Sequence, residues 1–259
     1  MEPNAEPVRV LFEGRYRKLV RDLPQTVFFC PECKGRGCTR CEGFGKLTKD
    51  SVQELVARVA MPRFKARRNK FHGAGREDLN VRMLGDGRPF VFEMLKAKRP
   101  DIDLGELEEE INRRWEGRIE VHGLRFCGRK RVAEIKEAQC AKEYLARVRF
   151  EEAQDPERIA EVLRGLEERG EVQLLQGTPT RVAHRRADRD RERWIRLIAW
   201  EQDGEEWMLT IRSEHGTYIK EAVSGDEGRT RPSLAQLFEA PCACVELDVL
   251  AILAPEQTA

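Results

Sequence analysis

The chain has 259 residues, of which 36% are charged and 40% hydrophobic, and its formal net charge is +1. This length accommodates one large domain, or one domain and a small module. No run approaches the roughly 18–20 apolar residues of a membrane helix, and the acidic start MEPNAEPVRV lacks the apolar segment of a secretory signal. We therefore expect a cytoplasmic protein with no membrane partner. Since the net charge is close to zero, any nucleic-acid-binding surface must be local.

The first notable motif is a cluster of cysteines. Residues 8–12 read as a strand, residues 13–23 as a basic connection, and four of the eight cysteines then crowd into CPECKGRGCTRC. Without a signal sequence, such crowding favours a metal site in a reducing compartment over disulfides. The spacing C-x2-C-x4-C-x2-C fills all four positions of a tetrahedral site, which is typical of a structural zinc ion. We predict this ion on Cys30, Cys33, Cys38 and Cys41; four reduced thiols in a flexible loop are the alternative.

A glycine-rich stretch follows the first predicted helix. Ser51 and Glu54 form a capping box that starts a helix over residues 51–61. Residues 62–70, PRFKARRNK, carry five cations and one aromatic residue, which suits contacts to phosphate as well as an ordinary solvated face. In FHGAGREDLNVRMLGDGRPFVFE, the glycines allow sharp turns and close approach of a ligand. Asp78 lies where this loop is predicted to enter a strand at residues 79–84, and a surface turn with an ion-paired Asp is the alternative.

The remaining elements alternate between strands and helices. The clearest helix, residues 155–170, has Pro156 near its start and Gly170 after its end. We also predict a helix from Asp103, a final helix from Pro232, a hairpin at residues 203–204, and strands at residues 88–96, 118–127, 143–150, 194–200, 206–212 and 243–250.

An arginine-dense run lies in the second half of the chain. Residues 181–196, RVAHRRADRDRERWIR, hold seven arginines against three acidic residues. Such a run is commonly a disordered tail, but this one leads directly into an apolar strand, so we predict an ordered basic edge. Arginine forks bind phosphate oxygens in a bidentate manner. After the hairpin, residues 216–218 turn from a strand into a helix and place Tyr218 near Lys220.

These motifs together resemble one enzyme family. The segments GRYRKLVRDLPQT, the four-cysteine block, HGAGREDLNVRMLGDGRPFVFE, RVAHRRADRDR and SEHGTYIKEAVSGDEGRTRPSLAQL are similar to the archaeal and eukaryotic tRNA pseudouridine synthases of the tenth family. The resemblance covers residues 8–253. It implies an α+β fold, with a mixed, mostly antiparallel central sheet, flanking helices and a cleft, plus a small four-cysteine zinc module. We expect residues 1–50 to hold the first strand and this module, and residues 51–259 the catalytic domain.

The resemblance also implies an activity and its residues. The enzymes isomerise uridine to pseudouridine in the T-arm of tRNA, at positions 54 and 55, with no redox or nucleotide cofactor. Asp78 matches the catalytic aspartate, Tyr218 the active-site tyrosine and Lys220 the basic partner of the aspartate, with Glu77 as a rival acid. The residues that we expect to contact the RNA substrate are Lys70, His72, Arg76, Arg82, Arg88, Arg185, Arg186 and Arg229.

One departure from the family pattern leaves a second interpretation open. The family carries a THUMP-type RNA-binding domain before the zinc block, whereas the zinc block already begins at Cys30 here. A zinc-containing RNA-binding subunit, or a paralogue that needs a separate THUMP-type partner for tRNA binding, is therefore the alternative to an enzyme.

Overall fold

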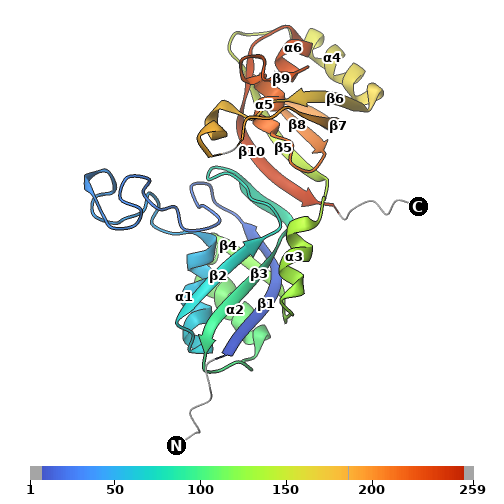
Figure 1. Cartoon of the computed structure of the whole chain (residues 1–259). Helices are drawn as coiled ribbons and strands as arrows, with labels where there is room; N and C mark the ends of the chain where they lie inside the picture. The colour runs from blue at the N-terminus through green and yellow to red at the C-terminus, as the bar shows by residue number, and fades with distance from the viewer. Residues whose placement is uncertain (1–7, 186, 254–259) are drawn as a thin grey trace, which may run out of the picture. The chain divides into compact units, whose positions relative to one another are not determined.

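The chain folds into two compact units, Met1–Ala138 and Gln139–Ala259. The computed structural model describes residues 8–185 and 187–253 (Figure 1). Each unit combines an antiparallel sheet with helices, so the predicted α+β class is confirmed. The division differs from the boundary that we expected at residue 50, because the first strand belongs to the same sheet as a strand that begins at Arg82. In the described part of the chain, no helix is both long and apolar enough to cross a bilayer.

The sheet of the first unit has the order β4-β1-β3, with β2 also paired to β3. Its strands are β1 (Val8–Lys18), β2 (Arg68–Gly73), β3 (Arg82–Ala97) and β4 (Ile119–Phe126). Strand β1 continues six residues beyond its predicted end, because Phe12, Tyr16 and Lys18 alternate onto one face and are fully buried there. What the sequence indicated as a basic connection is therefore partly a core strand.

Aromatic side chains fill the core of this unit. The ring of Phe12 is stacked between Phe64 and Phe92, with ring centroids 5.7 and 5.5 Å apart. Phe90 and Phe71 extend this cluster to the ring of Tyr16. Offset-stacked and edge-on pairs of this kind add to the stabilisation from burial alone. The cluster anchors the strands on either side of the loop that carries Asp78.

Side chains cap the first two helices of the first unit. The helices of the first unit are α1 (Val52–Phe64), α2 (Leu104–Arg114) and α3 (Lys130–Glu137). The Ser51 hydroxyl accepts from the Glu54 amide at 3.2 Å, and Asp103 accepts from the amides that follow it, as predicted. Helix α1 passes Met61, its predicted end, and Arg63 pairs there with Glu110 of α2 at 2.8 Å. Helix α3 was not predicted, and Arg129 at its N-cap makes no side-chain capping bond.

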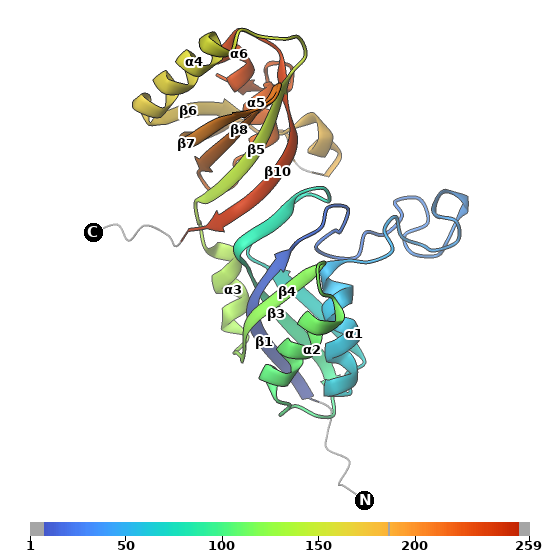
Figure 2. The ribbon, with the colours of Figure 1, turned by 180° about the vertical axis from the view of Figure 1, so that it is seen from behind.

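The four predicted zinc ligands lie in a loop of the first unit. We call residues 28–47 the four-cysteine module; its helical part is the short turn η1 (Thr39–Cys41). The isolated bridge between Phe29 and Lys46 closes the base of the module. In Figures 1 and 2 the loop extends away from the sheet of its own unit, next to the start of α1.

The sheet of the second unit has the order β10-β5-β8-β7-β6-β9. Its strands are β5 (Lys142–Phe150), β6 (Glu171–Gln176), β7 (Arg191–Asp203), β8 (Glu206–Ser213), β9 (Thr230–Arg231) and β10 (Cys242–Ile252). Its helices are α4 (Pro156–Arg169), α5 (Ile219–Ser224) and α6 (Leu234–Phe238), and short turns lie at η2 (Thr180–Arg185) and η3 (Asp226–Gly228). Helix α4 covers β7 and β8, with Leu163 and Leu166 beside Ile195 and Leu209.

Candidate active site and metal centre

Asp78 lies in the loop between β2 and β3. Residues 79–80 form a turn rather than the start of the predicted strand, and β3 begins at Arg82. The Val81 amide donates to the Asp78 carbonyl at 3.1 Å and closes this turn. Asp78 itself is half-buried. The aspartate is thus placed just before a strand, in a turn with a defined hydrogen bond.

The residue before Asp78 is locked inside the protein. The side chain of Glu77 is 0% exposed, and its carboxylate pairs with the Nε of Arg88 at 2.8 Å. The hydroxyl of Tyr16 lies 2.8 and 2.9 Å from the two carboxylate oxygens. Burial, together with the negative charge of Glu77, raises the pKa of Tyr16 well above its ordinary value, so this phenol stays protonated and donates.

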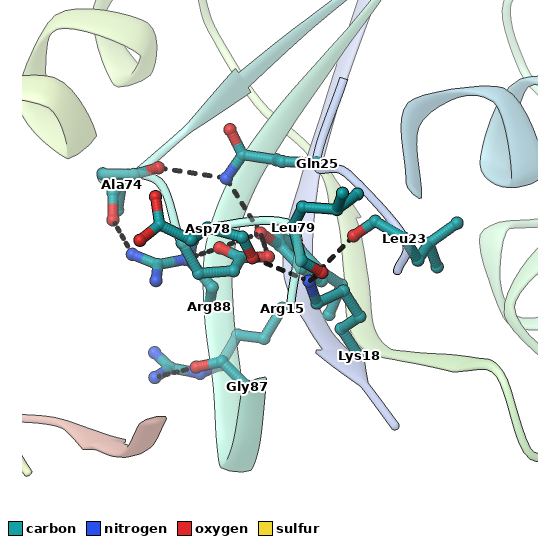
Figure 3. A network of polar contacts seen from close by, with 12 residues as sticks. Arg15, Lys18, Leu23, Gln25, Ala74, Asp78, Leu79, Gly87 and Arg88 are labelled. Atoms are coloured by element: carbon teal, nitrogen blue, oxygen red, sulfur yellow. Dashed lines mark hydrogen bonds and ion pairs between the residues drawn. The ribbon is translucent and has the colours of Figure 1, made fainter. Parts of the chain in front are cut away.

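Lys18 and Gln25, together with Arg88, hold the backbone of the same loop (Figure 3). The buried ammonium of Lys18 donates to the carbonyls of Asp78 and Leu79 at 3.1 and 3.0 Å, and to that of Leu23 at 2.8 Å. Gln25 donates to the Gly75 carbonyl at 3.0 Å, and Arg88 donates to the Ala74 carbonyl at 2.8 Å. The loop is therefore fixed at both ends by buried donors from β1, β3 and the segment between β1 and the four-cysteine module.

This arrangement separates two adjacent acids. The sequence left Glu77 as a rival to Asp78, but Glu77 is closed off from solvent and paired with Arg88. A buried, hydrogen-bonded carboxylate of this kind is a structural group, since breaking its pairs leaves uncompensated charge. Of the two neighbours, Asp78 is the one that solvent, and hence a substrate, can reach.

In the second unit, Tyr218 stands at the N-cap of α5, in extended conformation. The side-chain amide of Gln176 clamps its backbone, accepting from the Tyr218 amide at 2.8 Å and donating to the Tyr218 carbonyl at 3.0 Å. Thr230 orients the amide through its hydroxyl, 3.2 Å from Gln176 Nε2. Gln176 and Thr230 are buried, so the clamp is rigid. Sequence reasoning missed Gln176, which lies 42 residues from its partner.

The ring of Tyr218 is half-buried beside a cation. The guanidinium carbon of Arg181, in η2, lies 5.9 Å from the ring centroid. Arg181 is itself held by the buried carboxylate of Glu221 on α5, at 2.6 Å. Lys220, the second residue of α5, is half-buried in the same unit. Because Asp78 belongs to the first unit and Lys220 to the second, their pairing stays a prediction.

The predicted RNA-contacting residues fall into different surroundings. Lys70, Arg76 and Arg229 are not enclosed in the core, and Arg82 is half-buried. His72 faces the buried Glu93, 3.2 Å away. Arg88 is 1% exposed and is committed to Glu77, so its position favours holding the loop over touching RNA. Arg185 ends η2, and Arg186 lies outside the described residues.

The four cysteines of the four-cysteine module converge on one point. Their sulfur atoms all lie within 4.8 Å of one another, and three of the pairs are 3.7 Å apart. Backbone amides of Gly37 and Gly45 point at the sulfurs of Cys33 and Cys41 at 3.2 Å. A tetrahedral metal–thiolate site with bonds of about 2.3 Å has sulfur–sulfur edges of about 3.8 Å. The donor set therefore fits one tetrahedrally bound metal ion.

Comparison with known proteins agrees with these features. A family model described as "Pus10, C-terminal" matches residues 11–253. The chain belongs to this family. It is 44% identical over 257 residues to the tRNA pseudouridine synthase Pus10 of Methanopyrus kandleri, a match that covers 97% of this chain and 57% of that protein. It is 46% identical over 248 residues to the Pus10 of Methanothermobacter marburgensis, covering 95% and 60%.

The Pus10 C-terminal match runs through both units, from β1 to the end of β10. The chain nevertheless spans little more than half the length of the curated relatives named above. Among solved structures, a chain in the crystal structure of a Cbf5-Nop10-Gar1 complex has a TM-score of 0.43 and 19% identity, over 76% of this chain and 44% of that one. The resemblance predicted from the sequence is thus confirmed at the level of the family, by the family model and the curated relatives.

Lys18 makes the stability of this Pus10-family chain depend on pH. Burial lowers the pKa of Lys18 from its ordinary 10.5 to about 8, so the folded chain loses this proton at a lower pH than the unfolded chain. Between pH 8 and 10 the unfolded state binds more protons, and the free energy of unfolding rises with pH, by about 2 kcal/mol from this residue. We expect the free energy of unfolding of wild type, measured with urea, to rise by this amount relative to that of Lys18→Met between pH 7 and 10. The same difference in unfolding free energy between wild type and Lys18→Met at both pH values would contradict the burial of a charged Lys18.

Proposed function

We propose that this chain is the catalytic part of an RNA pseudouridine synthase that acts on tRNA, with Asp78 as its catalytic carboxylate. The observation that carries the proposal is the family match over residues 11–253, which includes every residue predicted for the reaction. The buried ion pair and hydrogen bonds of Glu77 support it. They enclose the rival acid, whereas the half-buried Asp78 is within reach of a substrate. The relatives named above carry the same activity in their names.

The reaction defines what the acid must do. Uracil leaves C1′ of the ribose, rotates and rejoins through C5, so the composition of the nucleotide does not change. An ionised carboxylate at Asp78 either attacks the nucleotide or takes a proton from the sugar. We assign to Lys220 the role of keeping this carboxylate charged and oriented. The clamp of Lys18 on the Asp78 and Leu79 carbonyls holds the backbone from which this carboxylate projects.

Tyr218 would hold the base during its rotation. Its ring offers one face for stacking on uracil, while Arg181 lies 5.9 Å from its centroid. The Gln176 clamp fixes the backbone of the tyrosine, so the ring pivots only about its side-chain torsions. A rigid platform of this kind limits the entropy lost when the flipped base is captured.

The substrate that we propose is the T-arm of tRNA, at uridine 54, 55 or both. A base inside a folded loop must be flipped out, at a cost of a few kcal/mol. We expect exposed cations to offset that cost by contacting phosphates, among them Lys70 and Arg76 on the first unit and Arg229 on the second. We place this activity in the cytoplasm, where four reduced thiols persist.

The alternative is a zinc-containing RNA-binding subunit or paralogue that works with a separate THUMP-type RNA-binding subunit. Exposed cations such as Lys70, Arg76 and Arg229 would suit RNA binding without any chemistry. In that case the chain would bind T-arm RNA but would not modify it.

Asp78→Asn is expected to abolish pseudouridine formation. The amide keeps the shape of the carboxylate but removes its charge and with it most of its strength as a nucleophile or base, so activity should fall at least roughly 1,000-fold. The measurement is tritium release from tRNA labelled at uracil C5. The matched control is Asp86→Asn, which changes an exposed carboxylate on the following strand and should retain wild-type activity. Absence of release by the wild type on T-arm uridines would favour the RNA-binding subunit.

We further propose that the four-cysteine module holds one structural zinc ion. Four thiolates occupy every position of a tetrahedral site, and zinc accepts this donor set without redox chemistry. Bound zinc would supply a fixed anchor for the two cysteine-bearing turns. Two other contacts also connect parts of the module. One is the backbone bridge at Phe29–Lys46, and the other is the solvent-exposed ion pair Arg40–Glu32 at 3.0 Å.

Elemental analysis should give one zinc per chain. The double variant Cys33→Ser and Cys41→Ser should lose it, because these two buried thiols lie on opposite halves of the site. Cys242→Ser serves as the control, since Cys242 is buried in β10 of the other unit. Stoichiometric iron, or no metal in freshly purified wild type, would show that the assignment is wrong.

A further inference from the structure

The four-cysteine module displays apolar side chains to an unusual degree. Of the six large hydrophobic residues that are exposed in the described part of the chain, four lie in this short segment. They are Phe28, Phe29, Phe44 and Leu47, and the ring of Phe44 is the most open, at 75% exposed. Large exposed apolar groups gathered in one place mark an interaction surface rather than a random distribution.

The internal repeat of the module places two side chains at equivalent tips. In the first turn the Arg36 amide donates to the Cys33 carbonyl at 3.1 Å, and in the second the Phe44 amide donates to the Cys41 carbonyl at 2.8 Å. Each tip is flanked by glycines with positive φ, which only glycine adopts without strain. One turn therefore presents a guanidinium, and its counterpart presents a phenyl ring.

The two turns pack backbone against backbone. A Cβ on Gly37 would lie 2.6 Å from the Gly43 carbonyl oxygen, and one on Gly45 would lie 2.5 Å from that of Gly35. Phe29 lies over Gly35, where a Cβ would come within 3.2 Å of its ring. Because these contacts and the metal site fix the backbone, Phe44 is displayed from a rigid support. A rigid aromatic loses little entropy when a partner covers it.

The charge around these rings indicates which partner they suit. Within residues 28–47, four cationic residues accompany two acidic ones. Arg40 is paired with Glu32 and Lys46 with Glu54, while Lys34 and Arg36 are exposed. Protein–protein interfaces are depleted of lysine at their centres. Exposed aromatic rings among cations are instead typical of surfaces that stack unpaired bases and track a phosphate backbone.

We propose that the four-cysteine module is an RNA-contacting surface, in which Phe44 stacks on an unpaired base and Arg36 contacts the backbone phosphate. The inference rests on the proposed function for the identity of the RNA, a tRNA with an accessible loop. It adds an RNA contact outside the Asp78 loop and assigns the metal ion the role of holding the stacking ring in place.

The test compares three variants in the catalytically silent Asp78→Asn background, so that binding is measured without turnover. The probe is an unmodified tRNA transcript at fixed salt concentration. Phe44→Leu keeps an apolar side chain but removes the ring, and should weaken binding about five- to a hundred-fold. Phe44→Trp keeps a ring and should retain wild-type affinity. Phe126→Leu, an equally conservative change at an exposed phenylalanine of β4, is the control and should leave affinity unchanged.

Arg36→Gln tests the phosphate contact separately. It should lower the dependence of log affinity on log salt by somewhat less than one. Wild-type affinity in Phe44→Leu would overturn the stacking proposal, and so would equal losses in Phe44→Leu and Phe44→Trp with the metal retained. Pseudouridine formation by the Asp78-containing enzyme is scored independently, so failure of the activity and failure of this surface are distinguishable.

Discussion

A buried ion pair, Glu77 with Arg88, is the interaction on which the proposed site depends. Both side chains are almost fully enclosed, and Tyr16 and Gln25 complete the hydrogen bonding around them. Removing one partner of such a pair leaves a charge stranded in the core, which costs several kcal/mol. The pair therefore holds one acid of the Glu-Asp sequence inward. The neighbouring Asp78 is half-buried, on a loop that Lys18 fastens by its carbonyls.

The second unit likewise fixes a residue through its backbone, here with an uncharged side chain. Gln176 pairs with both backbone groups of Tyr218, as a neighbouring strand would, and leaves the ring to be contacted from outside. In both units the residue proposed to meet the substrate is held through its backbone by a buried side chain from a distant part of the sequence. Its position is therefore set without using its own functional group. Preorganisation of this kind lowers the free energy needed to orient the reacting groups.

Local features of the fold were predictable, and long-range ones were not. The caps at Ser51 and Asp103 and the cysteine spacing act over a few residues, so the sequence displays them directly. The extension of β1 was missed because its basic residues hide the inward alternation of Tyr16 and Lys18. Arg88 was predicted to contact RNA because its positive charge is visible in the sequence. Its ion pair with Glu77 forms only in the folded chain, so the sequence alone did not reveal it.

Glu77 thus has a structural role, and Asp78 is the acid that we propose for the chemistry. Urea unfolding of Glu77→Gln and Asp78→Asn, measured side by side with wild type, tests this assignment of roles most directly. We expect Glu77→Gln to lower the free energy of unfolding by about 3 kcal/mol, because Arg88 loses its charged partner, and Asp78→Asn to change it by about 1 kcal/mol or less. Wild-type stability in Glu77→Gln, or a comparable loss in both variants, would contradict the assignment.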